Sequence, residues 1–300
     1  MINNKRLNIN EAEKDKGEPY MNIKITSDST CDLSTDILQL YNISLLPLHI
    51  EKGGKIFQDG IDIYPDDIFY HVSNGGTIST TSAVNPLEYK SFFEQFVNKY
   101  DAVIHINIGS GFSSCYQNAC IAAQEFENVF VVDSMNLSTG QGHVVVEAAI
   151  KAAEDYPIDC ILECLAYMIP KIRASFLLDR LDYMAKGGRC SAVMALGANL
   201  LKFKPCIEVE NGKMRVGKKY RGTLKRCLMQ YIDDKLENSN KIVPQRAFIT
   251  HTTINSEIAD AVKDAVSKKA IFDKVYETNA GCTISSHCGQ NTLGVLFIEK

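Results

Sequence analysis

Hydrophobic and polar positions along the chain follow two alternating periods. From residue 21 onward, short apolar runs rich in Val and Ile are followed by longer stretches in which apolar residues recur every three or four positions. This order predicts βαβ units, and therefore an α/β protein with a parallel sheet flanked by helices. In the first half we expect strands at residues 22–26, 44–50, 101–108 and 129–133, and helices at residues 34–41, 113–126 and 138–153.

The pattern changes after residue 156, which predicts a second domain. Asn211-Gly212 is typical of the turn of a β-hairpin. Later strands are expected at residues 246–251, 274–278 and 294–299, with a helix at residues 256–269. The expected organisation is an N-terminal α/β domain at residues 21–155 and a C-terminal α/β domain at residues 156–300. The polar residues 1–20 are expected to form a disordered extension.

Charge and composition narrow the class of protein. The 32 basic residues are balanced by 36 acidic ones, a net charge of -4, which argues against a nucleic-acid partner. No apolar run approaches the roughly 20 residues that span a bilayer, and residues 1–20 lack the apolar stretch of a secretory signal. The ten cysteines include no Cys-x-x-Cys pair and are interpreted as reduced thiols. We therefore expect a cytoplasmic protein without a transmembrane segment.

A metal site and a bound cofactor are not expected. The nearest approach to a metal-ligating cluster is Cys282, His287 and Cys288. Two of these three residues are adjacent in the chain, so they do not easily face one ion together.

Candidate binding residues follow the predicted strands. Ligands of parallel sheets collect where strands end and helices begin. The loop at residues 109–114 places glycines ahead of a predicted helix, which suits a carboxylate or a phosphate. Helix capping alone would also explain Ser113, and turn bonding would explain the hydroxyls of residues 80–82. His287 is expected on a glycine-containing loop before the last strand.

Taken in order, these segments resemble the DegV family of fatty-acid-binding proteins. The resemblance covers nearly the whole chain from Met21. It rests on five motifs, namely residues 26–33 (TSDSTCDL), Thr81-Ser82, residues 109–116 (GSGFSSCY), residues 181–189 ending in Gly-Gly-Arg, and residues 287–294 (HCGQNTLG).

The resemblance implies a two-domain α/β carrier, rather than an enzyme, with a long-chain fatty acid in a tunnel between the domains. Such a carrier presents the carboxyl group to an ATP-dependent fatty acid kinase subunit, which forms an acyl phosphate. By motif position, Thr81 and Ser113 contact the carboxylate, with His287 nearby. The remaining residues of the implied site are Ser82, Ser110 and Gly111 for the ligand, and Arg189 and Arg221 for docking of the kinase.

Two other functions stay open on residue types. A hydrolase would use Ser110 or Ser113 as nucleophile, His251 or His287 as base and Asp28 or Asp133 as orienting acid. The segment lacks the second glycine of the Gly-x-Ser-x-Gly elbow, which argues against this function. A phosphate- or nucleotide-binding protein would use the loop at residues 109–114, but the chain lacks P-loop spacing there.

Overall fold

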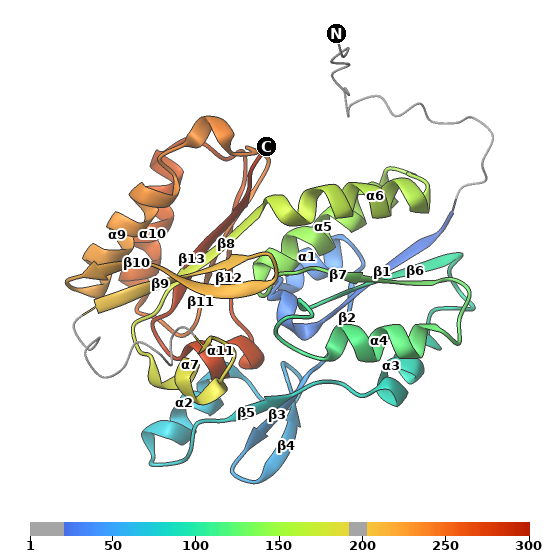
Figure 1. Cartoon of the computed structure of the whole chain (residues 1–300), viewed down its shortest axis with the longest axis horizontal. Helices are drawn as coiled ribbons and strands as arrows, with labels where there is room; N and C mark the ends of the chain where they lie inside the picture. The colour runs from blue at the N-terminus through green and yellow to red at the C-terminus, as the bar shows by residue number, and fades with distance from the viewer. Residues whose placement is uncertain (1–20, 192–202) are drawn as a thin grey trace.

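Two larger β-sheets lie side by side in the computed structural model of the chain, with helices packed around them and a third sheet of three short strands at one end (Figure 1). The structure describes residues 21–191 and 203–300. The extension expected at residues 1–20 lies outside the described residues.

The first sheet is the predicted parallel sheet. Its strand order is β2-β1-β6-β7, and every neighbouring pair is parallel. Its strands are β1 (Ile23–Asp28), β2 (Ser44–Leu46), β6 (Ala102–Asn107) and β7 (Val129–Asp133). All six residues of β6 are buried, as expected for a strand covered on both faces. The helices of this half are α1 (Thr35–Leu40), α3 (Pro86–Phe93), α4 (Cys115–Ala123) and α5 (Thr139–Ala153), and a short 3-10 turn, η1 (Ser29–Cys31), follows β1.

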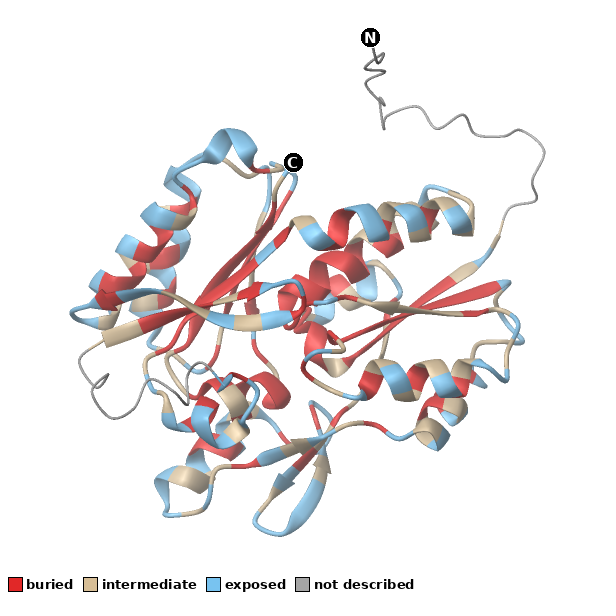
Figure 2. Ribbon diagram, viewed as in Figure 1, coloured by how far each residue is buried: buried red, intermediate tan, exposed pale blue. Residues whose placement is uncertain are grey.

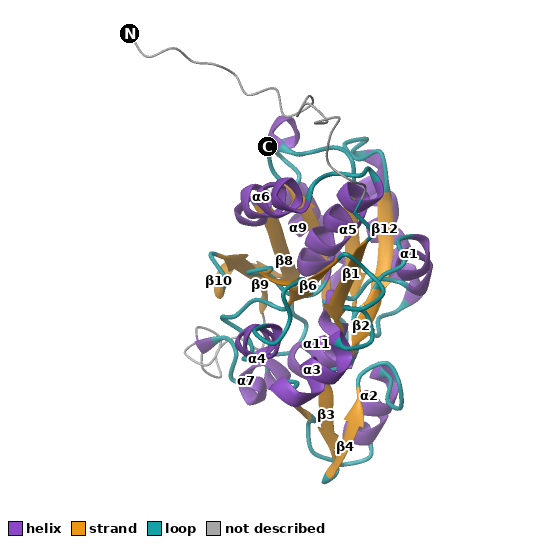
Figure 3. Ribbon diagram, turned by 90° about the vertical axis from the view of Figure 1, so that its right-hand side faces the viewer, coloured by secondary structure: helices purple, strands orange, loops and turns teal. Residues whose placement is uncertain are grey.

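The prediction of one strand at residues 44–50 was wrong. The segment forms β2 and then β3 (His49–Lys52), which belong to different sheets. Pro47 lies between them, and proline has no N–H to continue a strand ladder. Strand β3 pairs antiparallel with β4 (Lys55–Gln58) and β5 (Thr80–Ser82), so the expected turn at residues 80–82 is also a strand. Figure 3 shows β3, β4 and helix α2 (Pro65–Ser73) at one end of the molecule.

The second sheet is mixed rather than parallel. Its order is β10-β9-β8-β13-β11-β12, in which β11 and β12 run parallel and the other neighbours are antiparallel. The strands are β8 (Ile172–Leu177), β9 (Phe203–Glu210), β10 (Lys213–Arg221), β11 (Ala247–His251), β12 (Val275–Asn279) and β13 (Leu293–Ile298). Asn211 and Gly212 have φ of 50° and 71°, which confirms the predicted hairpin turn.

Helix α5 lies between the two sheets. It contacts β1 and β6 of the first sheet and β8 and β13 of the second. Its residues are buried almost without interruption over the first three turns, as the red colour in Figure 2 shows. The predicted domain boundary at residue 155 follows α5, and the largest buried cluster contains residues from both sides of it. The two halves therefore share one core, and their independence as domains stays a prediction.

The remaining helices belong to the second half. Helices α9 and α10 pack together, and α9 lies against β9 and β10, whereas α7 lies against α11. The helices are α6 (Ile158–Met168), α7 (Asp182–Gly187), α9 (Leu224–Lys235), α10 (Ser256–Lys268) and α11 (Cys282–Cys288), with short 3-10 turns η2 (Ile169–Lys171) and η4 (Ser239–Lys241). Within residues 21–191 and 203–300, no helix is both long and apolar enough to cross a bilayer.

Candidate functional site

A small interior cavity lies where β5, the loop after β6 and α11 meet. Its volume is about 40 Å³. The polar groups at its wall include Thr81 and Ser82 from β5, Ser113 from the loop, and His287 from α11. Most of the remaining wall is apolar, with contributions from Leu48, Ile108, Phe112, Leu137, Met214 and Ile284. The structure thus brings four of the sequence-predicted ligand residues to one cavity.

Thr81 and His287 form the centre of this polar group. The Thr81 hydroxyl oxygen lies 2.8 Å from Nε2 of His287. The other ring nitrogen, Nδ1, is buried without a hydrogen-bond partner among the described residues. It packs against Gly187, where a Cβ atom would clash with the imidazole. The prediction that His287 lies in a loop was wrong, because this residue lies in the last turn of α11.

Burial controls the charge of His287. Desolvation, with a smaller contribution from the positive charge of Arg189, lowers the pKa of His287 to about 4. The imidazole is therefore neutral at pH 7, and one of its nitrogens carries a proton that can be donated. A carboxylate bound beside it would favour the protonated ring and raise its pKa.

Ser113 reaches the same cavity from the loop before α4. Its hydroxyl lies 3.2 Å from the Cys115 sulfur and accepts a 3.3 Å hydrogen bond from the Cys115 N–H. The hydroxyl therefore has a local role at the start of α4 while it faces the cavity. The neighbouring Phe112 is buried and forms part of the apolar wall.

Ser110 and Gly111 do not line this cavity. The Ser110 N–H donates to the Asp133 carboxylate at 3.0 Å. Gly111 packs against the carbonyl of Gly212 at the tip of the β9–β10 hairpin, where a Cβ atom would clash. These two residues fix the loop against its neighbours in the structure, and their contact with a ligand stays a prediction.

The motif that follows β1 positions the loops of the site. The buried Asp28 carboxylate accepts a 2.8 Å hydrogen bond from the Ile108 N–H and so holds the loop that carries Ser113. Asp32 accepts from the Ser138 hydroxyl at 2.5 Å and from the Gly281 N–H at 2.8 Å. Burial raises the pKa of Asp28, and it raises the pKa of Asp32 to about 8. This segment thus orients the site without lining the cavity.

A second cavity of about 20 Å³ lies behind the first. Leu137, Ile284 and Cys288 line both cavities, so these three side chains lie between them. Two of the hydroxyls around the second cavity already have protein partners. The Thr252 hydroxyl donates to the Gly289 carbonyl at 2.8 Å, and the Thr292 hydroxyl donates to the Cys288 carbonyl at 2.9 Å. The surface that faces the second cavity is consequently almost entirely apolar, and it suits a hydrocarbon better than a polar group.

The parts of a hydrolase are present but not assembled. Ser113 has no hydrogen bond to a histidine among the described residues. His251 is held by the Thr252 carbonyl at 2.9 Å and by Glu277 at 3.3 Å. Asp133 is held by backbone N–H groups, including that of Ser110. The serine, the base and the orienting acid that the sequence suggested for a hydrolase therefore do not form a catalytic triad in the structure.

The loop at residues 109–114 offers few free donors to a phosphate. The N–H of Gly109 donates to the Asn136 carbonyl at 2.7 Å, and the N–H of Phe112 donates back to the Gly109 carbonyl at 2.9 Å. The Ser110 N–H is bound to Asp133. A phosphate-binding loop needs several such groups directed at the ligand. Across the part of the chain that the structure describes, no group of three or more His, Cys, Asp or Glu residues is arranged to hold a metal ion.

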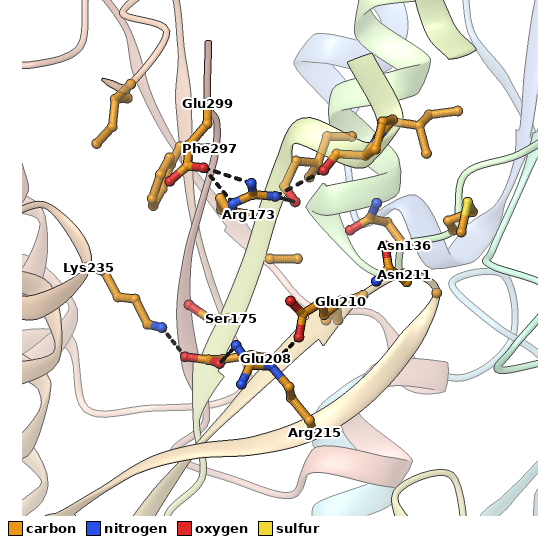
Figure 4. Close-up of a pocket in the computed structure, with 18 of the residues that line it drawn as sticks. Asn136, Arg173, Ser175, Glu208, Glu210, Asn211, Arg215, Lys235, Phe297 and Glu299 are labelled. Carbon is orange, nitrogen blue, oxygen red and sulfur yellow. Dashed lines mark hydrogen bonds and ion pairs between the residues drawn. The ribbon is translucent and has the colours of Figure 1, made fainter. Parts of the chain in front are cut away.

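A larger pocket of about 420 Å³ opens on the second sheet, and its charged side chains pair with one another (Figure 4). Arg215 lies 2.8 Å from Glu208 and 2.7 Å from Glu210, and Arg173 lies 2.7 Å from Glu299. An ionic ligand would have to displace an existing partner in each case. The smaller cavity at Thr81 is therefore the better candidate site.

The two arginines of the predicted docking surface are exposed. Arg189 lines the cavity beside His287, and its guanidinium donates to the Gly187 carbonyl at 2.8 Å. Arg221 ends strand β10 and has no ion-pair partner among the described residues. Both charges are accessible to a partner, and their role in docking stays a prediction.

Fold and site together define an α/β protein with two large sheets, a small third sheet, and an apolar interior cavity that is polar at one end. Residues 22–300 match the family model described as "Uncharacterised protein, DegV family". The chain belongs to the DegV family. A DegV domain-containing protein of Caldanaerobacter subterraneus is 32% identical over 280 residues, covering 93% of this chain and 99% of the relative.

Solved structures of this family share the fold. A DegV family protein from Thermus thermophilus, described by its fatty acid binding, superposes with a TM-score of 0.87 at 25% identity, covering 93% of this chain and all of that one. DegV from Bacillus subtilis, described as a fatty acid binding protein, gives a TM-score of 0.81 at 28% identity with the same coverage. The predicted family and fold class are confirmed.

Proposed function

We propose that this chain binds one long-chain fatty acid in its interior, with the carboxylate on Thr81, Ser113 and His287. The observation that carries the proposal is the meeting of these three polar side chains at one end of an otherwise apolar interior. The family relationship supports it, because the relatives from Thermus thermophilus and Bacillus subtilis are described as binding fatty acids. Ser82 lies at the same end, and Ser110 and Gly111 support the loop behind it.

The acyl tail would supply most of the affinity. Each buried methylene contributes about 0.8 kcal/mol, so a dozen give on the order of 10 kcal/mol before the costs of association. Hydrogen bonds to a carboxylate contribute about 1.5 to 3 kcal/mol each and largely offset the loss of hydration. The hydroxyls and the imidazole would therefore fix the orientation of the ligand.

Binding requires side chains of the wall to move. The two cavities of about 40 and 20 Å³ are each far smaller than a long acyl chain. Met184 and Met214 line the first cavity, and methionine adapts its shape readily because its side chain is unbranched. Displacement of Leu137 and Ile284, which lie between the cavities, would join them into one tunnel. The tail would then occupy the space that these side chains release.

The proposed role includes presentation of the acid to an ATP-dependent kinase subunit. A carboxylate oxygen would attack the γ-phosphorus of ATP, forming the acyl phosphate and releasing ADP. Neutral hydroxyl donors leave such an oxygen more available than a bidentate arginine would. Arg189 at the cavity and Arg221 on β10 supply exposed positive charge for the partner.

Organic extraction of the purified full-length chain tests the binding. We expect mass spectrometry of the extract to find about one long-chain fatty acid per chain. A nucleotide or phosphosugar in its place, together with no binding of added stearate or oleate, would refute the proposal. A separate assay with a p-nitrophenyl ester distinguishes the carrier from a hydrolase, which would turn over the ester and lose this activity in Ser113→Ala.

Reconstitution with a fatty acid kinase subunit, ATP and loaded carrier tests the presentation. Acyl phosphate can be trapped with hydroxylamine and counted. We expect Arg189→Gln combined with Arg221→Glu to lower the rate at least tenfold per bound fatty acid, with the bound acid counted in the same samples. Lys268→Glu, an exposed charge reversal on α10, is the matched control and should leave the rate unchanged. An unaltered rate in the double variant would exclude docking through these arginines.

A further inference from the structure

The three-stranded sheet β4-β3-β5 holds helix α11 at both ends. At the start of the helix, the contact comes from Asp59, the residue that follows β4. At the end of the helix, it comes from Thr81 on β5, which meets His287. Helix α11 has seven residues, and a helix of that length depends on tertiary contacts for its position.

Asp59 is a buried carboxylate that caps this helix from a distant part of the chain. It is 4% exposed. One oxygen accepts a 2.8 Å hydrogen bond from the Cys282 N–H. The other oxygen accepts from the Thr283 N–H at 3.1 Å, from the Thr283 hydroxyl at 2.6 Å and from the Ser29 hydroxyl at 3.1 Å. Both of its oxygens are therefore used to fix the first turn of α11.

Asp59 is itself held in place by backbone contacts. Its own N–H donates to the Leu48 carbonyl at 2.9 Å, and it forms a β-bridge with Ile63. Strand β3 pairs with β4 through His49 and Gln58 and with β5 through Ile50 and Thr81. Asp59 and Thr81 are consequently tied to Leu48, just before the central strand, and to Ile50 within it.

We propose that Asp59 is a positioning residue for the Thr81–His287 pair, because it sets the place of α11 against β5. The assignment of that pair to the fatty acid carboxylate rests on the proposed function, whereas the geometry itself can be measured in ligand-free protein. Asp59 acts through α11 and does not line the cavity. The small sheet thereby serves as a template that aligns a hydroxyl and an imidazole 206 positions apart.

Loss of the Asp59 carboxylate has a defined physical consequence. The N–H groups of Cys282 and Thr283 would remain buried without an acceptor, which is costly unless the helix moves toward water. A shift of α11 would carry the imidazole away from Thr81 and expose it. The pKa of His287, lowered to about 4 by burial, would then rise toward the ordinary value for histidine.

The test is NMR titration of the His287 imidazole in ligand-free Asp59→Ala and Asp59→Asn, with His287→Gln to assign the resonance. We expect Asp59→Ala to raise the pKa of His287 by at least about one unit and to weaken stearate binding about tenfold. Asp59→Asn retains one acceptor oxygen and should give a smaller change in the same direction. If Asp59→Ala does not fold, Asp59→Asn decides the outcome.

Asp66→Asn is the matched control. The Asp66 carboxylate also joins this region to the second half of the chain, because it accepts from the Thr253 hydroxyl at 2.9 Å, but it is exposed and accepts no hydrogen bond from α11 among the described residues. It should leave the titration and the affinity unchanged. An unchanged titration in both Asp59 variants, with only a lower melting temperature, would overturn the proposal. Absence of stearate binding in the wild type would refute the proposed function but not the positioning role.

Discussion

The Thr81 hydroxyl and Nε2 of His287 lie 2.8 Å apart although one belongs to a short strand of the first half and the other to α11, the last helix of the chain. This pair is buried enough to keep the imidazole neutral. A hydrogen-bond donor in such surroundings is more effective toward an anion than it would be in water, because the local dielectric is low.

Replacement of Thr81 by Val tests the hydroxyl at nearly constant volume. Loss of one hydrogen bond to a carboxylate costs about 1.5 to 3 kcal/mol, so we expect stearate affinity to fall about ten- to a hundredfold. Thr80→Val is the matched control, since the exposed Thr80 hydroxyl bonds to Glu51 instead. Equal affinities of the two variants in a fluorescence displacement assay would count against the site.

Ser113→Ala should weaken stearate binding in the same direction. The effect is expected to be smaller than that of Thr81→Val, because the Ser113 hydroxyl already has local partners at Cys115. Ser114→Ala provides the control, since Ser114 is exposed and its side chain makes no capping hydrogen bond. Isothermal titration calorimetry measures both. Loss of affinity in Ser114→Ala alone would place the head group elsewhere.

Fatty acid binding should take up protons at pH 6. The pKa of His287 is about 4 in the ligand-free protein, and a bound carboxylate raises it, so the complex holds more protons than the free components. By linkage, the affinity then increases as the pH falls from 7 toward 5. Calorimetry in two buffers of different ionisation enthalpy counts the protons. His287→Gln should abolish the uptake, and equal uptake in this variant would assign it to another group.

Ile284→Ala tests the wall between the two cavities. Truncation of a buried isoleucine costs about 2 to 4 kcal/mol of stability, and here it would also join the cavities. We expect the ligand-free variant to melt lower and to regain more of its melting temperature with stearate than the wild type gains. Val262→Ala, in the separate core of α10, should be destabilised without this rescue. A similar recovery of melting temperature in both variants would show that Ile284 does not separate two parts of a ligand tunnel.

His105 should make the protein sensitive to acid. Burial lowers the pKa of His105 to about 3, whereas in the unfolded chain it is about 6.5. The unfolded state therefore binds more protons between these values, and stability is lost as the pH falls through this range. The expected loss from pH 7 to pH 5 is about 2 kcal/mol. Urea unfolding should show His105→Phe gaining that amount relative to the wild type at pH 5, and a pH-independent difference would contradict the assignment.

The parallel sheet could be predicted because its strands are buried on both faces and therefore appear as continuous apolar runs. The split at Pro47 was visible in the sequence as a missing backbone donor, but the two sheets that it separates depend on pairings with residues 55–58 and 80–82. The antiparallel order of the second sheet likewise depends on contacts distant in sequence, such as β8 with β13.

The sequence predicted which residues form the candidate site better than it predicted how they are arranged in space. Motif order identified Thr81, Ser113 and His287, which meet at one cavity. It could not show that Ser110 and Gly111, in the same loop as Ser113, are held away by Asp133 and the hairpin tip. No local sequence pattern predicted the role of Asp59, because the N–H groups that it binds are 223 and 224 positions further along the chain.

Because α5 packs on both large sheets, a hinge opening between the two halves is unfavourable. Such an opening would separate α5 from one of the two sheets that it contacts. The buried face of this long helix would then be exposed to water. On the proposed function, a fatty acid would therefore enter through local movement of the short elements around the cavity, such as α7, α11 and the β9–β10 hairpin. Rates of loading and release would accordingly reflect these small parts of the molecule rather than a hinge between its halves.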